Sequence, residues 1–139
     1  MTTATATFEI TESTPEATPF AADDAGVAYG RMVLAKTFHG DLEGTSAVEM
    51  LFTRTSDAAG GFAGAAYVAL ERISGTIHGR TGSFAVLHVS TVTASGETWA
   101  QWPISPGSGT GELAGIAGEG RIDIGDDGAH SFTLEYELG

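Results

Sequence analysis

Apolar and polar side chains alternate with a period of two along most of this chain. In residues 3–12, TATATFEITE, the alternation places one apolar set on a single face: Ala4, Ala6, Phe8 and Ile10. Because successive side chains of a strand point to opposite faces of a sheet, this pattern predicts a β-strand. Seven further strands are predicted: 27–39, 42–54, two within 67–90, 98–104, 119–125 and 130–138.

Short segments rich in glycine and aspartate separate these strands and predict antiparallel hairpins. They are Gly40-Asp41, 57–61, 78–81, Ser95-Gly96 and 126–128. The apolar sets of the last two strands share a face only if their loop has an odd number of residues. We therefore expect a three-residue loop with Gly128 at positive φ. Residues 106–118, PGSGTGELAGIAG, break the strand pattern and predict no more than one helical turn at 112–114.

Eight strands joined by short turns must bury one face and protect two sheet edges. A closed up-and-down barrel does both, so the predicted fold is an all-β antiparallel β-barrel of about eight strands, with a β-sandwich as the alternative. The 139 residues are predicted to form a single domain, 1–139. Residues 13–26 are the one long connection, read either as a lid over a barrel mouth or as a loop crossing an edge.

Strands 27–39 and 42–54 are partly apolar on both faces. A hairpin centred on Gly40-Asp41 pairs Val33 with Val48 and keeps this two-sided pattern in one sheet. One side therefore needs a cover, and a partner subunit would supply it. We expect a homodimer or a higher homo-oligomer.

The chain is strongly acidic. Lys and Arg total 6, Asp and Glu total 18, the formal net charge is −12, and Lys36 is the only lysine. Such a surface repels phosphate backbones and anionic membranes, so neither nucleic acid nor a membrane is an expected partner. No cysteine is present, which excludes disulfides and thiolate chemistry. The sequence shows no signal-peptide pattern and no apolar run near the ~20 residues of a membrane span, so a cytoplasmic location is expected.

One acid and one imidazole are well placed for shared chemistry. A turn centred on Gly79-Arg80 sets Glu71 directly opposite His88, and any loop with an even number of residues keeps both on one face. A carboxylate beside an imidazole orients the ring and raises its basicity. Glu71 and His88 are therefore the candidate catalytic pair, although a purely structural buried pair has the same pattern.

The same face supplies candidate ligand-binding residues. From the two strands of 67–90 they are Tyr67, Ile73, Phe84 and Val86. A two-residue loop at Ser95-Gly96 would add Trp99 and Gln101 and would point Trp102 the other way. Aromatic residues in this pattern line a pocket or simply fill a core, and the sequence leaves both interpretations open.

Other motifs are rejected on their context. His39, His78 and His130 lie at strand ends or turns without metal-ligand spacing, so no metal site is predicted. The glycines of 107–111 imitate a dinucleotide or phosphate loop, but the long helix and the lysine that those loops need are missing. No cofactor is predicted.

Several segments resemble one known family. They are GTS with EM in 44–50, YV with ER in 67–72, GRTGSF in 79–84 with His88, SGTGELAGI in 108–116, and the ending HSFTLEY in 130–136. Together they resemble a family of small bacterial proteins of unknown function, which is similar in structure to the lipocalin-like barrel of allene oxide cyclase. The resemblance implies an eight-stranded barrel that is often oligomeric, and it implies no established reaction.

Three functions remain open at this point. The first is binding of a small apolar molecule in or at the mouth of the barrel, with Glu71 and His88 as polar contacts. The second is a cofactor-independent isomerase or cyclase in which the same pair moves a proton. The third is a structural or interaction protein with a filled barrel and an oligomeric exterior.

Overall fold

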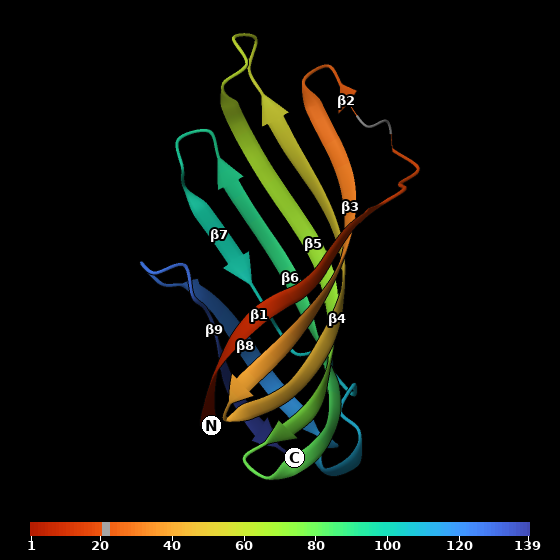
Figure 1. Ribbon diagram of the computed structural model, residues 1–139, viewed down its shortest axis with the longest axis vertical. Helices are drawn as coiled ribbons and strands as arrows, with labels where there is room; N and C mark the ends of the chain where they lie inside the picture. Colours follow the sequence, from red (N-terminus) through yellow and green to blue (C-terminus); the bar gives the residue numbers. More distant parts are fainter. Residues whose placement is uncertain (21–22) are drawn as a thin grey trace.

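The computed structural model describes residues 1–20 and 23–139 and is built almost entirely of β-strands (Figure 1). The strands are β1 Thr2–Glu16, β2 Asp23–Asp24, β3 Val27–Gly40, β4 Leu42–Ser56, β5 Phe62–Ile77, β6 Arg80–Thr93, β7 Thr98–Gln101, β8 Ile116–Ile124 and β9 His130–Leu138. The described residues contain one helical turn, the 3-10 helix Gly111–Leu113, close to the single turn that the sequence predicts.

The strands form one antiparallel sheet in the order β7-β6-β5-β4-β3-β1-β9-β8, with β2 beside β3. The segment after β7 joins the two ends of this order. Leu87 N donates to Pro103 O (2.9 Å) on the β6 side, and Ile104 N donates to Gly118 O (2.9 Å) on the β8 side. The sheet is therefore a nearly closed barrel, as the strand pattern predicts.

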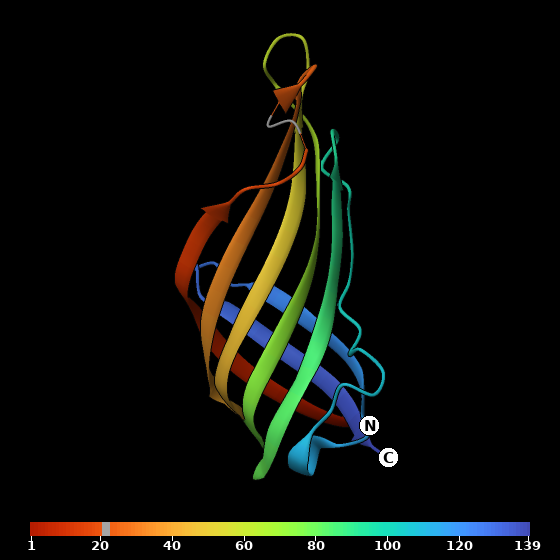
Figure 2. The ribbon, with the colours of Figure 1, turned by 90° about the vertical axis from the view of Figure 1, so that its right-hand side faces the viewer.

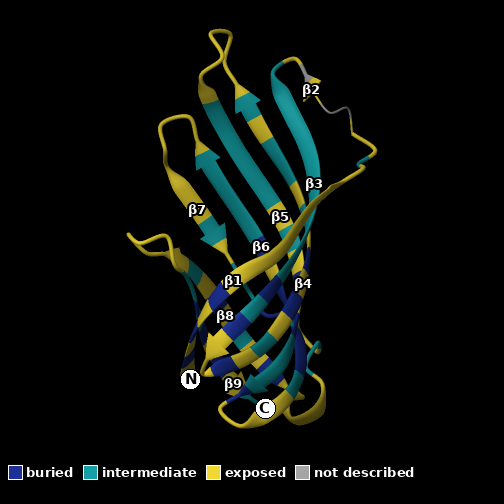
Figure 3. Ribbon diagram, in the orientation of Figure 1, coloured by how far each residue is buried: buried dark blue, intermediate teal, exposed yellow. Residues whose placement is uncertain are grey.

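The barrel is filled at one end and open at the other. Buried positions gather around the end where both chain termini lie (Figure 3). The core there contains Phe38, Leu42, Ile73, Ile77, Phe84, Val86, Leu113, Phe132 and Leu134, all exposed by 1% or less except Phe132 at 2%. The other halves of β3, β4, β5 and β6 extend beyond the closed part as a free-standing sheet (Figure 2).

Two of the hairpin predictions had different outcomes. Residues 126–128 form the expected three-residue loop, with Gly128 at φ 82° and Gly125 N donating to Ala129 O at 2.8 Å. The β3–β4 register is one residue away from the prediction, because the turn is centred on Asp41 alone. Val33 consequently lies opposite Glu49, not Val48.

The connection at 13–26 is shorter than predicted. β1 continues to Glu16, and β2 occupies Asp23–Asp24. Part of this segment, 21–22, lies outside the described residues. In the described part, Phe20 packs on Tyr29 with ring centroids 5.5 Å apart, at the edge of β3 and away from the barrel interior. Within the described ranges no helix is long and apolar enough to cross a membrane.

Candidate functional site

The β5–β6 hairpin brings Glu71 and His88 together inside the barrel. Its turn is His78-Gly79, with φ 47° and 81°, and not the predicted Gly79-Arg80. The register therefore shifts by two residues, so that Glu71 lies opposite Val86 and His88 opposite Ala69. A register shift of two residues keeps both side chains on the same face of the sheet. His88 Nε2 lies 2.8 Å from Glu71 Oε1, and the two residues are 3% and 1% exposed.

Two further polar side chains complete this cluster, and both come from strands that the sequence interpretation did not connect to it. Lys36 on β3 places Nζ 3.3 Å from Glu71 Oε1, and Ser46 on β4 donates from Oγ to Glu71 Oε2 at 2.5 Å. Lys36 and Ser46 lie opposite each other in the β3–β4 register. The signal was present: Lys36 is the only lysine and shares the parity of the inward Phe38.

The Glu71 carboxyl is the centre of the cluster, and three donors surround it. Its burial acts to raise its pKa, since the charged form is poorly solvated. The hydrogen bond from His88 and the positive charge of Lys36 act in the other direction and prevail, so the pKa of Glu71 lies below its ordinary value. Glu71 is therefore a carboxylate at neutral pH.

This charge state determines the tautomer of His88. A carboxylate can only accept, so Nε2 of His88 must carry the proton that it donates to Glu71. In the neutral ring Nδ1 is then unprotonated and basic. Among the hydrogen bonds of the described residues, none involves this nitrogen. The arrangement is an oriented base with its free nitrogen inside the barrel.

An apolar cavity of about 140 Å³ lies between this cluster and the open end of the barrel. Lys36 and His88 reach its floor, while Glu71 and Ser46 lie behind them. It is lined by Phe8, Ile10, Leu34, Lys36, Val48, Met50, Tyr67, Ala69, His88, Ile122 and His130. A cavity of about 150 Å³ with apolar walls holds a molecule the size of benzene.

The structure places the predicted ligand-binding residues in three different environments. Tyr67 lines the cavity. Ile73, Phe84 and Val86 point inward but are exposed by only 0%, 1% and 0% and belong to the packed core. They support the floor of the cavity from below, and a ligand in this cavity would not touch them.

The prediction for Trp99 and Gln101 was wrong. Trp99 pairs with Thr91 on the outward side and is 51% exposed, and Gln101 is exposed as well. The β6–β7 loop has three residues, with Thr93 N donating to Glu97 O at 2.9 Å and Gly96 at φ 90°. An odd loop reverses the faces of the following strand. Trp102 is therefore the inward tryptophan.

Trp102 contacts the site from the seam of the barrel. Its ring stands nearly perpendicular to that of His88, with centroids 6.4 Å apart. Its Nε1 is the only buried side-chain nitrogen or oxygen without a partner among the described residues. Trp102 thus replaces Trp99 as the aromatic neighbour of the imidazole.

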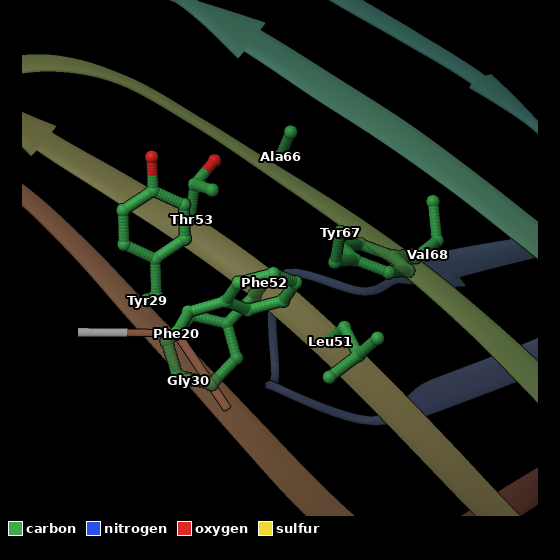
Figure 4. A pocket seen from close by; sticks show the side chains of 9 residues that line it. All are labelled: Phe20, Tyr29, Gly30, Leu51, Phe52, Thr53, Ala66, Tyr67 and Val68. Carbon is green, nitrogen blue, oxygen red and sulfur yellow. The ribbon is translucent and has the colours of Figure 1, made fainter. Parts of the chain in front are cut away.

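Two open grooves lie on the extended half of the sheet. An inner groove of about 240 Å³ continues from the cavity and shares Met50 and Tyr67 with it. An outer groove of about 300 Å³ lies around Tyr29, Leu51 and Val68 (Figure 4). The outer groove is lined by no charged side chain, whereas the cavity inside the barrel is lined by Lys36, His88 and His130.

The described residues contain no group of three or more His, Asp or Glu side chains arranged to hold a metal ion. The other three polar groups of the cluster, Lys36, Ser46 and His88, instead all contact the Glu71 carboxylate. The fold and the cluster define a small β-barrel with an acid–base group at the bottom of an apolar cavity.

A family model described as "Protein of unknown function (DUF3224)" matches residues 4–136, and the chain belongs to this family. It is similar to a crystal structure of a protein with unknown function from the DUF3224 family of Shewanella oneidensis MR-1. The two are 36% identical, the match covers 100% of this chain and 98% of that chain, and the TM-score is 0.87. No functionally curated protein matches the chain.

The predicted resemblance to a small family of unknown function is therefore confirmed. Neither of these two matches is an allene oxide cyclase. The likeness to that barrel consequently carries no argument about chemistry here, and the function has to be inferred from the site itself.

Proposed function

We propose that this protein binds a small, mainly apolar molecule in the mouth of its barrel. The observation that supports the proposal is the cavity of about 140 Å³, whose walls are apolar and whose floor presents Lys36 and His88. Apolar walls with a few fixed polar groups are typical of sites for small molecules. A barrel kept only for its stability would gain by filling this space with side chains.

The inner groove extends the room available to a ligand. Met50 and Tyr67 border both spaces, so a molecule seated on the floor can pass its apolar end along the inner face of the extended sheet. This continuity explains how a cavity near the size of benzene can serve a longer molecule.

The test is binding of a neutral apolar dye, N-phenyl-1-naphthylamine, followed by fluorescence. Ala69 lines the cavity, and Ala69→Phe fills it. Ala117 is an exposed alanine of strand β8, and Ala117→Phe is the matched control. We expect Ala69→Phe to weaken dye binding by about tenfold or more, since the aromatic ring occupies the space of the dye. Equal binding by the two variants would contradict the proposal.

A second candidate function is proton transfer on a bound carbon acid, as in an isomerase. The oriented His88 favours it, because Glu71 fixes Nε2 as the donor and leaves Nδ1 as the base. The test uses cyclohexanone in D₂O, whose hydrogens next to the carbonyl exchange under base catalysis. The protein should accelerate this exchange and His88→Gln should not. No acceleration by the unmodified protein would leave binding as the only role.

A further inference from the structure

The charges around the cavity are opposite in sign to those of the molecule as a whole. The chain carries a net charge of −12, yet its only lysine is 6% exposed and points into the barrel. The ionisable side chains other than tyrosine that line the cavity are Lys36, His88 and His130, and none of its lining residues is an acid. The one nearby carboxylate, Glu71, is 1% exposed and lies behind them.

The charges of the floor balance before any ligand binds. Lys36 and Glu71 are 3.3 Å apart and form a buried ion pair, while His88 Nε2 lies 2.8 Å from the same carboxylate. Lys36 Nζ also lies 4.6 Å from the centroid of the Phe8 ring. Phe8 in turn stacks on His130, with ring centroids 5.1 Å apart. A cationic ligand would meet only basic side chains here: Lys36, His88 and His130.

An anionic group entering the cavity would meet donors from two strands. The Lys36 ammonium on β3 has three N–H groups, and its contact with Glu71 does not use all of them. Neutral His88 presents an unprotonated Nδ1, which repels an anion, whereas the protonated ring donates from both nitrogens. One negative charge on the ligand and one proton on His88 leave the buried charges balanced, which a low-dielectric interior requires.

We infer that the ligand is a monocarboxylic acid with an apolar body, and that its binding draws one proton onto His88. This inference rests on the proposed function and specifies its ligand class. The carboxylate lies against Lys36 and His88, and the apolar body fills the cavity and follows the inner groove past Met50 and Tyr67. A phosphate ester, with up to two negative charges, would require positive charge that the floor does not have.

Calorimetric titration with octanoate and with 1-octanol tests the inference, because the two probes share a chain and differ in charge. At pH 6 we expect octanoate to bind about tenfold or more tightly than 1-octanol. Titrations in phosphate and in Tris, whose ionisation enthalpies differ, should report uptake of about one proton per octanoate at pH 7.5. Octanoate binding should weaken as the pH rises, whereas 1-octanol binding should not change.

Substitutions identify the residue that takes up the proton when octanoate binds. His130 also faces the cavity and is the alternative acceptor, while Lys36, Glu71 and Ser46 are the remaining polar groups around the site. His88→Gln should abolish proton uptake, and His130→Gln should preserve it. The double variant Lys36→Met/Glu71→Gln removes the ion pair without leaving a lone buried charge, and it should lose the preference for octanoate while still binding 1-octanol.

The outcomes separate this inference from the proposed function. Equal affinity for 1-octanol and octanoate without proton uptake would overturn the monocarboxylate inference and leave apolar binding intact. Proton uptake that persists in His88→Gln would overturn the assignment to His88. Failure of both probes and of the neutral dye to bind would remove the proposed function itself.

Discussion

At the scale of single residues, the Lys36–Glu71 pair is the costliest feature of the barrel interior. Burial removes water from both charges, and only close, well-oriented contacts compensate for that loss. Removing one partner leaves the other charge buried without a counter-charge. Lys36→Met should therefore reduce the free energy of unfolding by about 3–5 kcal/mol. The double variant Lys36→Met/Glu71→Gln should lose much less than the sum of the single changes, which urea denaturation will measure.

The exposed Arg31–Glu49 pair is the control for this double-mutant cycle. Its contacts of 2.7 and 2.9 Å are shorter than the 3.3 Å of Lys36–Glu71, but its side chains are 32% and 57% exposed to water. Solvent screens such a pair, so its coupling should be far smaller. Additive effects at Lys36 and Glu71 would show that the two charges do not depend on each other.

The lowered pKa of Glu71 makes the stability of the fold depend on pH. The ordinary value of the group is 4.5, and the folded protein holds it below that. Between the two values the unfolded chain binds more protons, so the free energy of unfolding falls as the pH drops from 4.5 toward the folded pKa. Urea denaturation from pH 7 to pH 3 should show this loss, and Glu71→Gln should show a smaller one. The same slope in both proteins would assign the effect to other carboxyls.

Sequence alone indicated part of this cluster. Glu71 and His88 share a hairpin, so parity placed them on one face even though the turn centre was two residues off. Lys36 and Ser46 lie on β3 and β4, the two strands that precede β5 in the sheet. Their place beside Glu71 depends on the registers of the β3–β4 and β4–β5 hairpins, and the predicted β3–β4 register was one residue off. A buried lysine also contradicts the usual rule that lysine faces water.

At the scale of elements, loop parity decided which predictions succeeded. The β8–β9 hairpin could be deduced because its two apolar sets had to coincide. The β6–β7 segment offered no such constraint: aromatic residues occur at both Trp99 and Trp102, and the sequence does not state whether the loop has two or three residues. One extra residue moved Trp99 to solvent and Trp102 to His88.

At the closed end of the barrel, a row of glycines face one another across β4, β5 and β6. Gly75 lies opposite Gly44 on one side and Gly82 on the other. A Cβ on Gly75 would lie 2.1 Å from the carbonyl oxygen of Glu43, which is backbone and cannot move aside. Neighbouring strands approach this closely only where the side chain is missing.

Gly75→Ala should therefore destabilise the fold by about 3 kcal/mol, the upper range for an overpacked interior. Gly79→Ala is the control, because a Cβ there meets nothing within 4 Å and only its φ of 81° is strained. That strain should cost about 1–2 kcal/mol. Thermal unfolding will compare the two, and an equal or larger loss in Gly79→Ala would contradict the close-approach explanation.

At the scale of the whole molecule, the extended half of the sheet is apolar on both faces. The outer patch consists of Leu51, Val68, Leu70 and Leu87, with exposures of 39%, 49%, 49% and 38%. Leu51 pairs with Val68 and Leu70 with Leu87, so the four side chains lie side by side on three neighbouring strands. Leu51 and Val68 also line the outer groove (Figure 4). Contiguous apolar surface of this kind marks an interaction site.

We expect a second copy of the chain to cover the outer patch. A different protein attracted to a chain of net charge −12 would be basic. The four residues of the patch are all aliphatic, so they offer a basic partner no carboxylate to contact. An aliphatic surface fits its own copy across a two-fold axis, because each half then meets the other. Analytical ultracentrifugation should report a dimer, and Leu70→Glu should convert it to a monomer because it buries two charges at the contact. Ile124→Glu, at a residue 68% exposed near the β8–β9 loop, should leave the dimer unchanged. A monomeric unmodified protein would show that the patch serves another purpose.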